Sequence, residues 1–417
     1  MEPNVLKVKI WDLDAGYLSW DHNAGIGIFE YDPGFLKQNL DIAPLTMSIH
    51  STRSKRQMPW TGNNDKLYQG LPPMIADSLP DKWGNSLFKA WLRDNHLSEK
   101  KITPVDHLSF IGNRAMGALT YEPAHKLGEK TTFTVDVQKL YEFARQVLNE
   151  RETTIMDQEN SFLWQDLIKI SSSPGGKRPK AIVALNEMTG EIISGQGIIP
   201  EGFQHFILKY DDHSAYPYGK LEFVYYRMAT DAGIKMMPSQ LKSYGNVTHF
   251  LTQRFDRLHN ERIHTQTMAA MLPAGDSYED IFSVIRQLKL PYNDLQELYI
   301  RMVFNVIARN VDDHSKNFAF CMNRDGSWRL SPAYDLTFSV DLAAPAYVNR
   351  HSLSVNGKYE NITREDLEII GRKNDIQNYK SLIDHVAEAI SMFGRYAREY
   401  EVDKRLVEEI KKEFLTV

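Results

Sequence analysis

The spacing of apolar residues changes along the chain, and this change limits the possible folds more than any other feature. Residues 5–12, VLKVKIWD, alternate apolar and polar side chains, as a strand with one buried face does. Strand-like patterns return in 180–186 and 205–210. From about residue 263 onward, most apolar residues recur at helical spacing. The sequence therefore predicts an α+β chain with a β-rich N-terminal part and a mostly helical C-terminal part.

Turn and cap residues mark out elements in the first third of the chain. Asn23 and Gly25 predict a break between two strands, and a helix is predicted to begin at about Asp81. Short strands are predicted around Gly112 and Gly117. The polar, turn-rich stretch AHKLGEKTT then predicts a boundary near residue 125.

The remaining segments complete the predicted organisation. Helices are expected near 135–149 and 160–169, and a third over 220–234 ends at Gly233. The stretch HFLTQRFDR predicts one more strand. We therefore expect three parts: 1–125, 126–257 and 258–417.

Composition excludes several classes of protein. A net charge of -5 provides no general basic field, so nucleic-acid binding over the whole surface is not expected. The basic residues Arg53, Lys55 and Arg56 could form a local nucleic-acid-binding patch, but the composition favours a solvated charged loop. The single cysteine, Cys321, allows no intramolecular disulfide. Because we find no secretion signal and no apolar run of about 18 residues, we expect a cytoplasmic protein without membrane contact.

The stretch RNVDDHSKNFAF, residues 309–320, gathers an unusual number of polar groups. Asp312 and Asn317 have the spacing D-x-x-x-x-N, in which an aspartate accepts a hydroxyl proton and an asparagine holds Mg²⁺ in protein kinases. His314 is expected to brace the loop from its buried side, while Asp313 and Lys316 have no assigned role. A solvated loop with local Asx turns is the alternative.

A second acidic residue follows about 20 positions later. Asp335 stands in SPAYDLTFS among apolar neighbours, where burial is costly without a cation or hydrogen bonds. Protein kinases carry a Mg²⁺-binding aspartate at a similar distance from the catalytic loop. An aspartate that caps a turn is the alternative.

Two earlier segments carry candidate phosphate-binding groups. Lys209 ends the strand HFILK, and Glu222 lies on the next helix, as in the lysine–glutamate pair of kinases. The glycine-rich loop Ser173-Pro174-Gly175-Gly176-Lys177 offers backbone N–H groups and positive charge to phosphate, although it is not a Walker A loop. A solvated lysine and a plain flexible loop are the alternatives. The four features follow the order found in kinases, which favours phosphotransfer.

These motifs together resemble the HipA family of serine/threonine kinases, the toxin components of two-component toxin–antitoxin modules. The resemblance covers nearly the whole chain and includes SPGGKRPKAIVAL, HFILKYD, LTQRFDR, NVDDHSKNFAF and LSPAYDL. It implies a two-lobed, protein-kinase-like α+β fold with a small β-rich N-terminal subdomain and a mostly helical C-terminal lobe.

The resemblance also implies residue roles. Asp312 corresponds to the catalytic base, and Asn317 and Asp335 correspond to the Mg²⁺ ligands. ATP is expected at Lys209 and at Ser173, Gly175, Gly176 and Lys177, with adenine near Gln253 and Phe255 in the segment that joins the lobes. Glu222 supports Lys209. Ser173 matches the family's autophosphorylated serine, with Ser171 and Ser172 as rival acceptors.

Partners follow from the same resemblance. It implies a helix-turn-helix antitoxin of the HipB type, operator DNA bound mainly through that antitoxin, and a protein substrate such as an aminoacyl-tRNA synthetase or another translation component. Two other functions are consistent with the residues: a small-molecule kinase, and a catalytically silent co-repressor that binds the antitoxin.

Overall fold

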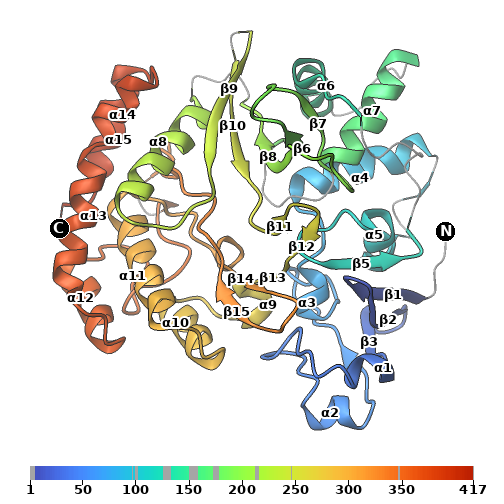
Figure 1. Ribbon diagram of the computed structural model, residues 1–417. Helices are drawn as coiled ribbons and strands as arrows, with labels where there is room; N and C mark the ends of the chain where they lie inside the picture. The colour runs from blue at the N-terminus through green and yellow to red at the C-terminus, as the bar shows by residue number, and fades with distance from the viewer. Residues whose placement is uncertain are drawn as a thin grey trace. The chain divides into compact units, whose positions relative to one another are not determined.

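The computed structural model describes residues 5–95, 97–98, 102–124, 133–149, 158–171, 178–211, 216–245, 247–345 and 348–416. The chain forms two compact units (Figure 1). The first comprises Met1–Asp212, Lys242–Thr265 and Met322–Gly326, and the second comprises His213–Leu241, Gln266–Cys321 and Ser327–Val417. The predicted division into 1–125, 126–257 and 258–417 is finer and stays a prediction.

An antiparallel five-stranded sheet opens the first unit. Its order is β4-β3-β2-β1-β5, with β1 Val5–Ile10, β2 Leu13–Asp21, β3 Ile26–Tyr31, β4 Trp60–Thr61 and β5 Leu119–Glu122. The predicted strand–turn–strand is confirmed. Gly25 has a φ of 66° in the turn between β2 and β3, a conformation that glycine adopts without a Cβ clash.

A second five-stranded sheet lies further along the first unit. Its order is β7-β6-β8-β10-β9, with β6 Lys180–Leu185, β7 Ile192–Ser194, β8 Gln204–Lys209, β9 Ser239–Tyr244 and β10 Val247–Gln253. Every residue of β6 is buried, which explains why the five residues after Lys180 are all apolar rather than alternating. The strand β9 was not predicted, because its sequence, SQLKSY, is polar and half-buried along one edge.

Helices of the first unit pack around these sheets. Their bounds are α1 Pro33–Leu36, α2 Thr52–Lys55, α3 Pro73–Ala76, α4 Lys82–Asp94, α5 Pro104–Ile111, α6 Val137–Asn149 and α7 Gln158–Ser171. Asp81 caps α4 through bonds to the N–H groups of Trp83 and Gly84, as the predicted start requires. The buried Trp83 donates its indole N–H to the Lys180 carbonyl at 3.2 Å, which ties α4 to β6.

One predicted strand in this region is wrong. Residues 107–111 lie in α5 and not in a strand, and only β5 follows them. The start of α5 is a capping box in which Thr103 and Asp106 bond each other's backbone, with Pro104 at the first helical position. The capping box stabilises the first turn of a helix, so the apolar residues that follow form a helix although their spacing predicted a strand.

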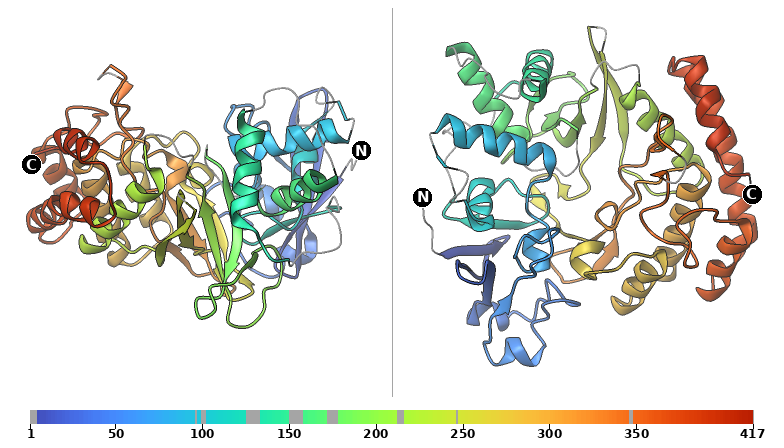
Figure 2. Two further views of the ribbon diagram at one scale, coloured as in Figure 1. Left: turned by 90° about the horizontal axis from the view of Figure 1, so that it is seen from above. Right: turned by 180° about the vertical axis from the view of Figure 1, so that it is seen from behind.

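The second unit is mostly helical, as predicted. Its helices are α8 Tyr218–Asp231, α9 Met268–Met271, α10 Tyr278–Gln287, α11 Tyr292–Ile307, α12 Arg364–Lys373, α13 Tyr379–Ser391, α14 Phe393–Glu399 and α15 Lys404–Glu413. The C-terminal helices, red in Figures 1 and 2, pack along α8 and α11. Twelve of the sixteen residues of α11 are buried, so this helix forms the centre of the unit.

The mostly helical C-terminal part also contains short strands, which the sequence analysis did not predict. A small sheet with order β13-β14-β15 interrupts the helices, formed by β13 His264–Thr267, β14 Ala319–Met322 and β15 Trp328–Leu330. Between β15 and α12, the described residues form no α-helix and no strand. None of the described helices is both long and apolar enough to cross a membrane.

We predict that two buried histidines make the first unit sensitive to mild acid. Burial lowers the pKa of His205 and of His264 from 6.5 to about 4. The unfolded chain binds these protons near pH 6.5 but the folded chain does not, so stability present above pH 6.5 is lost as pH falls toward 4. The free energy of unfolding of the wild type should therefore fall more steeply from about pH 7 to about pH 4.5 than that of His264→Gln, by up to about 3 kcal/mol.

Urea unfolding at each pH measures this difference. His385→Gln is the control, because His385 is exposed on α13. An equal pH dependence of wild type and His264→Gln would contradict the assignment of a neutral, buried imidazole.

Candidate functional site

The loop 312–317 lies between two buried elements of the second unit. Helix α11 ends at Ile307, and Arg309 then takes a φ of 56°, which turns the chain sharply. After the loop, the fully buried strand β14 begins at Ala319. Buried elements on both sides restrict the ends of the loop, so its polar residues occupy defined positions.

Asp313 anchors this loop from inside the protein. It is 1% exposed and accepts three hydrogen bonds: from Tyr278 Oη at 2.7 Å, from His351 Nδ1 at 2.8 Å and from the Ser352 N–H at 2.8 Å. Burial and the negative charge of Asp313 raise the pKa of Tyr278 well above its usual value, so Tyr278 is a stable donor. Such complete pairing is what allows a carboxylate to remain buried.

The predicted bracing role of His314 is therefore not supported. Its side chain is 45% exposed, its Nε2 lies 4.0 Å from a carboxylate oxygen of Asp312, and its buried Nδ1 has no hydrogen-bond partner among the described residues, so this side chain makes no bond that would brace the loop. Asp313, which had no assigned role, makes the buried contacts instead.

A chain of hydrogen bonds extends from Asp313 to the backbone of Asp312. Asn305 Nδ2 donates to Tyr278 Oη at 2.9 Å, and Asn310 Nδ2 donates to Asn305 Oδ1 at 3.0 Å. Ser339 Oγ links the two ends: it donates to Asn310 Oδ1 at 3.3 Å and accepts from the Asp312 N–H at 3.0 Å. The backbone of Asp312 is thus fixed while its side chain stays 56% exposed.

Asn317 is joined directly to Asp312. It lies at the end of the short 3-10 helix η2, Ser315–Asn317, and its Nδ2 donates to the Asp312 carbonyl at 2.8 Å. This bond closes the D-x-x-x-x-N loop. Because the amide nitrogen is used within the loop, the amide oxygen points the other way and is the atom available to a ligand.

Asp335 is brought toward the same loop by its neighbour. Tyr334 Oη donates to the Lys316 carbonyl at 2.7 Å, so the residues that precede Asp335 and Asn317 are in contact. Asp335 itself has a φ of 55°, which is uncommon for a residue with a Cβ and occurs often at functional sites. Asp312, Asn317 and Asp335 therefore belong to one cluster in the second unit.

The donor atoms of this cluster suit a hard divalent cation. An amide oxygen and a carboxylate are the kinds of ligand that Mg²⁺ takes beside phosphate oxygens and water. Within the described ranges, no group of three or more His, Cys, Asp or Glu side chains could hold a metal ion. A Mg²⁺ site formed by Asn317 and Asp335 fits the residues that are present.

The first unit places two lysines side by side. Lys209 ends β8 and pairs directly with Lys180 on the antiparallel strand β6, so both side chains lie on the same face. Lys180 is 4% exposed. Like charges directly opposite each other are unfavourable unless other groups compensate them, and both lysines make further contacts within the protein.

The other predicted nucleotide-binding residues occupy different positions. Gln253 ends β10 and is half-buried, as is Phe255, whereas the intervening Arg254 and the following Asp256 are buried. Glu222 lies on α8 in the second unit and is 7% exposed. Ser173, Gly175, Gly176 and Lys177 lie outside the described residues.

Sequence analysis missed several residues that shape these sites. The contacts of Asp313 join segments more than 30 positions apart, so no local pattern reveals them. Arg254 and Asp256 carried only a weak signal, opposite charges two residues apart, because β10 ends at Gln253 and the chain turns between them. Lys180 could be recognised only once the register of β6 and β8 was known.

Comparison with known families accounts for most of the chain. Residues 172–400, more than half of it, match the HipA-like C-terminal domain, and residues 6–122 match the HipA N-terminal domain. The chain belongs to the HipA family. The predicted membership is therefore confirmed.

Solved structures support the corresponding fold. HipA of Shewanella oneidensis MR-1, solved in a complex of HipA, HipB and operator DNA, superposes with a TM-score of 0.67 at 16% identity. The superposition covers 98% of this chain and 94% of that chain. The predicted fold is confirmed: it is two-lobed, α+β and protein-kinase-like, with a β-rich N-terminal part and a mostly helical C-terminal lobe.

Two further matches cover less of the chain. The candidate kinase Y4mE of Sinorhizobium fredii is 25% identical over 130 residues, which are 27% of this chain and 31% of that protein. This HipA-family chain thus spans about a third of the length of that curated relative. The superposition on the proinflammatory kinase CtkA of Helicobacter pylori covers 50% of this chain and 92% of that chain, with a TM-score of 0.31 at 14% identity.

We predict that Tyr278→Phe loosens the loop 312–317. The substitution removes a donor to buried Asp313 and an acceptor for Asn305, which should lower the free energy of unfolding by about 1–3 kcal/mol. Backbone amides of residues 311–318 should exchange hydrogen faster, as measured by mass spectrometry. Tyr299→Phe is the matched control, since it also loses a buried hydroxyl bond, to the Leu367 carbonyl. Equal exchange of the loop in both variants would contradict the anchoring role of Tyr278.

Proposed function

We propose that this HipA-family protein is an ATP- and Mg²⁺-dependent serine/threonine protein kinase. The observation that carries the proposal is the loop 312–317: a buried network fixes its backbone while the carboxylate of Asp312 remains exposed. An exposed carboxylate on a rigid backbone is what a general base for a substrate hydroxyl requires, because proton transfer needs a defined position within hydrogen-bond reach.

Each residue of the cluster has a role in this proposal. Asp312 accepts the proton of the attacking hydroxyl, and the Asn317–Asp312 bond holds the base at a set distance from the metal ligands. The amide oxygen of Asn317 and the carboxylate of Asp335 hold Mg²⁺. When bound, Mg²⁺ would neutralise charge on the phosphate oxygens and align them for in-line transfer.

Further residues have proposed roles in nucleotide binding. Lys209 binds the ATP phosphates, and the proximity of Lys180 on the same face supports this role because two cations match a polyphosphate. The glycine-rich segment with Ser173, Gly175, Gly176 and Lys177 covers the phosphates. Gln253 and Phe255 bind adenine largely through backbone groups, and Glu222 supports Lys209.

Autophosphorylation in the glycine-rich segment is part of the proposal. Of the three candidate acceptors, Ser171 is the last residue of α7 and is 0% exposed, so its hydroxyl is not accessible to an active site. We therefore expect modification at Ser173 or Ser172. A phosphate there would add nearly two negative charges to a phosphate-binding loop and repel ATP.

The proposed partner is a HipB-type antitoxin. The Shewanella protein that shares this fold was solved with HipB and operator DNA. We propose that operator DNA is bound mainly through that antitoxin and that the substrate is a protein of the translation machinery. Co-expression with a helix-turn-helix protein of the HipB type followed by size-exclusion chromatography tests the partner; separate elution at micromolar concentration would contradict it.

We predict that Asp312→Ala abolishes phosphotransfer but preserves ATP binding. Loss of a general base typically reduces rates by about 10²–10⁴-fold. Incubation with labelled ATP and Mg²⁺, followed by peptide mass spectrometry of the protein and of a cell lysate, measures the transfer. Asp384→Asn is the control, because Asp384 is similarly exposed, at 64%, in the surface ion pair with Arg364.

The outcomes separate the candidate functions. Label in the wild type's own peptides or in lysate proteins supports a protein kinase, and label in metabolites alone indicates a small-molecule kinase. A wild type that binds the antitoxin but neither binds ATP nor transfers phosphate is a silent co-repressor, and the kinase proposal fails.

We predict that Lys180→Met weakens ATP binding to a similar degree as Lys209→Met. Each change removes one of two adjacent cations, so the Kd for Mg·ATP should rise about tenfold, as measured by calorimetry. An unchanged Kd for Lys180→Met together with a large increase for Lys209→Met would restrict the phosphate contact to Lys209.

A further inference from the structure

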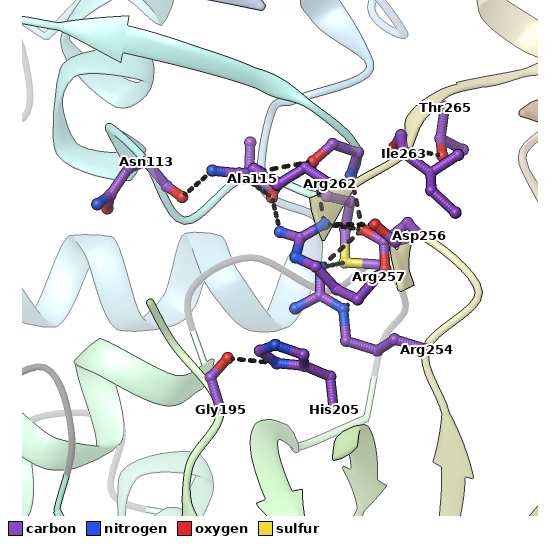
Figure 3. A network of polar contacts seen from close by, with 12 residues as sticks. Asn113, Ala115, Gly195, His205, Arg254, Asp256, Arg257, Arg262, Ile263 and Thr265 are labelled. Carbon is purple, nitrogen blue, oxygen red and sulfur yellow. Dashed lines mark hydrogen bonds and ion pairs between the residues drawn. The ribbon is translucent and has the colours of Figure 1, made fainter. Parts of the chain in front are cut away.

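A buried ionic cluster lies beside the proposed adenine-binding residues in the first unit (Figure 3). At its centre is Asp256, which is 0% exposed. Its carboxylate accepts from Arg254 Nε at 2.8 Å and Nη2 at 2.7 Å, and from Arg257 Nη1 at 2.7 Å. Burial opposes ionisation of Asp256, but the two guanidinium groups outweigh it and hold its pKa well below the usual range.

The same cluster holds a loop of the HipA N-terminal domain, residues 113–117. The Gly117 N–H donates to Asp256 Oδ2 at 2.7 Å. The carbonyls of Gly117 and Ala115 each accept from both Arg257 and Arg262, at 2.8 to 3.3 Å. Arg262 Nη1 also donates to the Asn113 carbonyl at 2.7 Å. The backbone carbonyls of this loop are therefore the hydrogen-bond acceptors of Arg257 and Arg262.

Gly117 is suited to this close contact. Its φ is +71°, and a Cβ at this position would lie 3.1 Å from the Thr265 nitrogen. A residue with a side chain would therefore be strained there and would displace the backbone groups that meet Asp256.

The cluster also sets the backbone beside the proposed adenine site. Arg254 and Asp256 are buried, and Gln253 and Phe255 alternate with them along the chain. The Arg254 N–H donates to the His205 carbonyl at 2.9 Å, so this segment is held both by β8 and by the ionic cluster. The chain turns at Phe255 and Asp256, directly after β10 ends at Gln253. Because Arg254 and Asp256 are both held by hydrogen bonds, the backbone on either side of Phe255 and next to Gln253 is fixed.

We propose that Asp256 and Arg262 are positioning residues for nucleotide binding, and that they make loop 113–117 of the N-terminal domain a supporting part of the adenine site. This inference rests on the proposed kinase function. It assigns the N-terminal domain a role within the catalytic unit: disturbing its loop lowers ATP affinity without changing the phosphotransfer step.

Arg262→Met is the decisive variant. It removes the three bonds that Arg262 donates to the carbonyls of Asn113, Ala115 and Gly117 but retains the apolar stem. Arg257 still donates to two of these carbonyls, and Asp256 keeps its four hydrogen bonds. Asp256→Asn is more severe because it leaves buried guanidinium groups without their counter-charge; where it folds, its effect should be larger. Tyr31→Phe is the control, since it also removes a buried bond to a carbonyl of the first unit, that of Met47.

Three measurements test the proposal. The Kd for Mg·ATP should rise about fivefold or more in Arg262→Met, whereas the Kd for Mg·tripolyphosphate, which lacks adenine, and the rate at saturating ATP should change less than about twofold. Hydrogen exchange should become faster both in 113–117 and in 252–256. Tyr31→Phe should leave all of these values unchanged.

The opposing outcomes are equally specific. Faster exchange in 113–117 with unchanged exchange in 252–256 would show that the loop is not coupled to the adenine-binding segment, and an equal loss of ATP and tripolyphosphate affinity would show that the effect is not specific to adenine. A wild type that binds no ATP would overturn the proposed function, and the exchange data would still decide the coupling.

Discussion

The buried carboxylate of Asp313 is the interaction on which the arrangement of the candidate active site depends. A charge at 1% exposure is tolerated only because three donors, from α10 and from the segment around His351, converge on it. Those donors come from parts of the chain far apart in sequence, so satisfying one buried charge draws them together. The exposed Asp312 next to it acquires a fixed backbone as a consequence.

The first unit also contains a buried carboxylate on which several hydrogen-bond donors converge. Asp256 is also buried, and it gathers two arginines and the Gly117 N–H, while Arg262 secures the same loop. Removing one partner from such a cluster costs more than the pair contributes, because the other charge remains buried without compensation. Each cluster therefore holds a short loop beside residues that we propose bind a ligand. Pre-organisation of this kind reduces the ordering that binding would otherwise require.

Family membership and site geometry answer different questions about this protein. The matches to both HipA domains establish the family, and the superposition on the Shewanella protein establishes the fold. Neither the family match nor the superposition shows which contacts position the individual side chains. The hydrogen bonds from Asn317 to the Asp312 carbonyl and from Tyr334 to the Lys316 carbonyl show this. They explain why the D-x-x-x-x-N loop and Asp335 form one cluster.

The sequence by itself determined the α+β class, most strands and helices, and the candidate residues Asp312, Asn317 and Asp335, because these depend on local periodicity and spacing. It predicted a strand at residues 107–111, where a capping box starts the helix α5 instead. It also assigned the bracing of the loop to His314, whereas Asp313 makes the buried hydrogen bonds. Only the tertiary structure decided the pairing of Lys180 with Lys209, the hydrogen-bond partners of Asp313 and the hydrogen bond that joins Asp256 to loop 113–117. These contacts join residues far apart in the chain, and the need to compensate a buried charge becomes visible only when the fold shows which charges are buried.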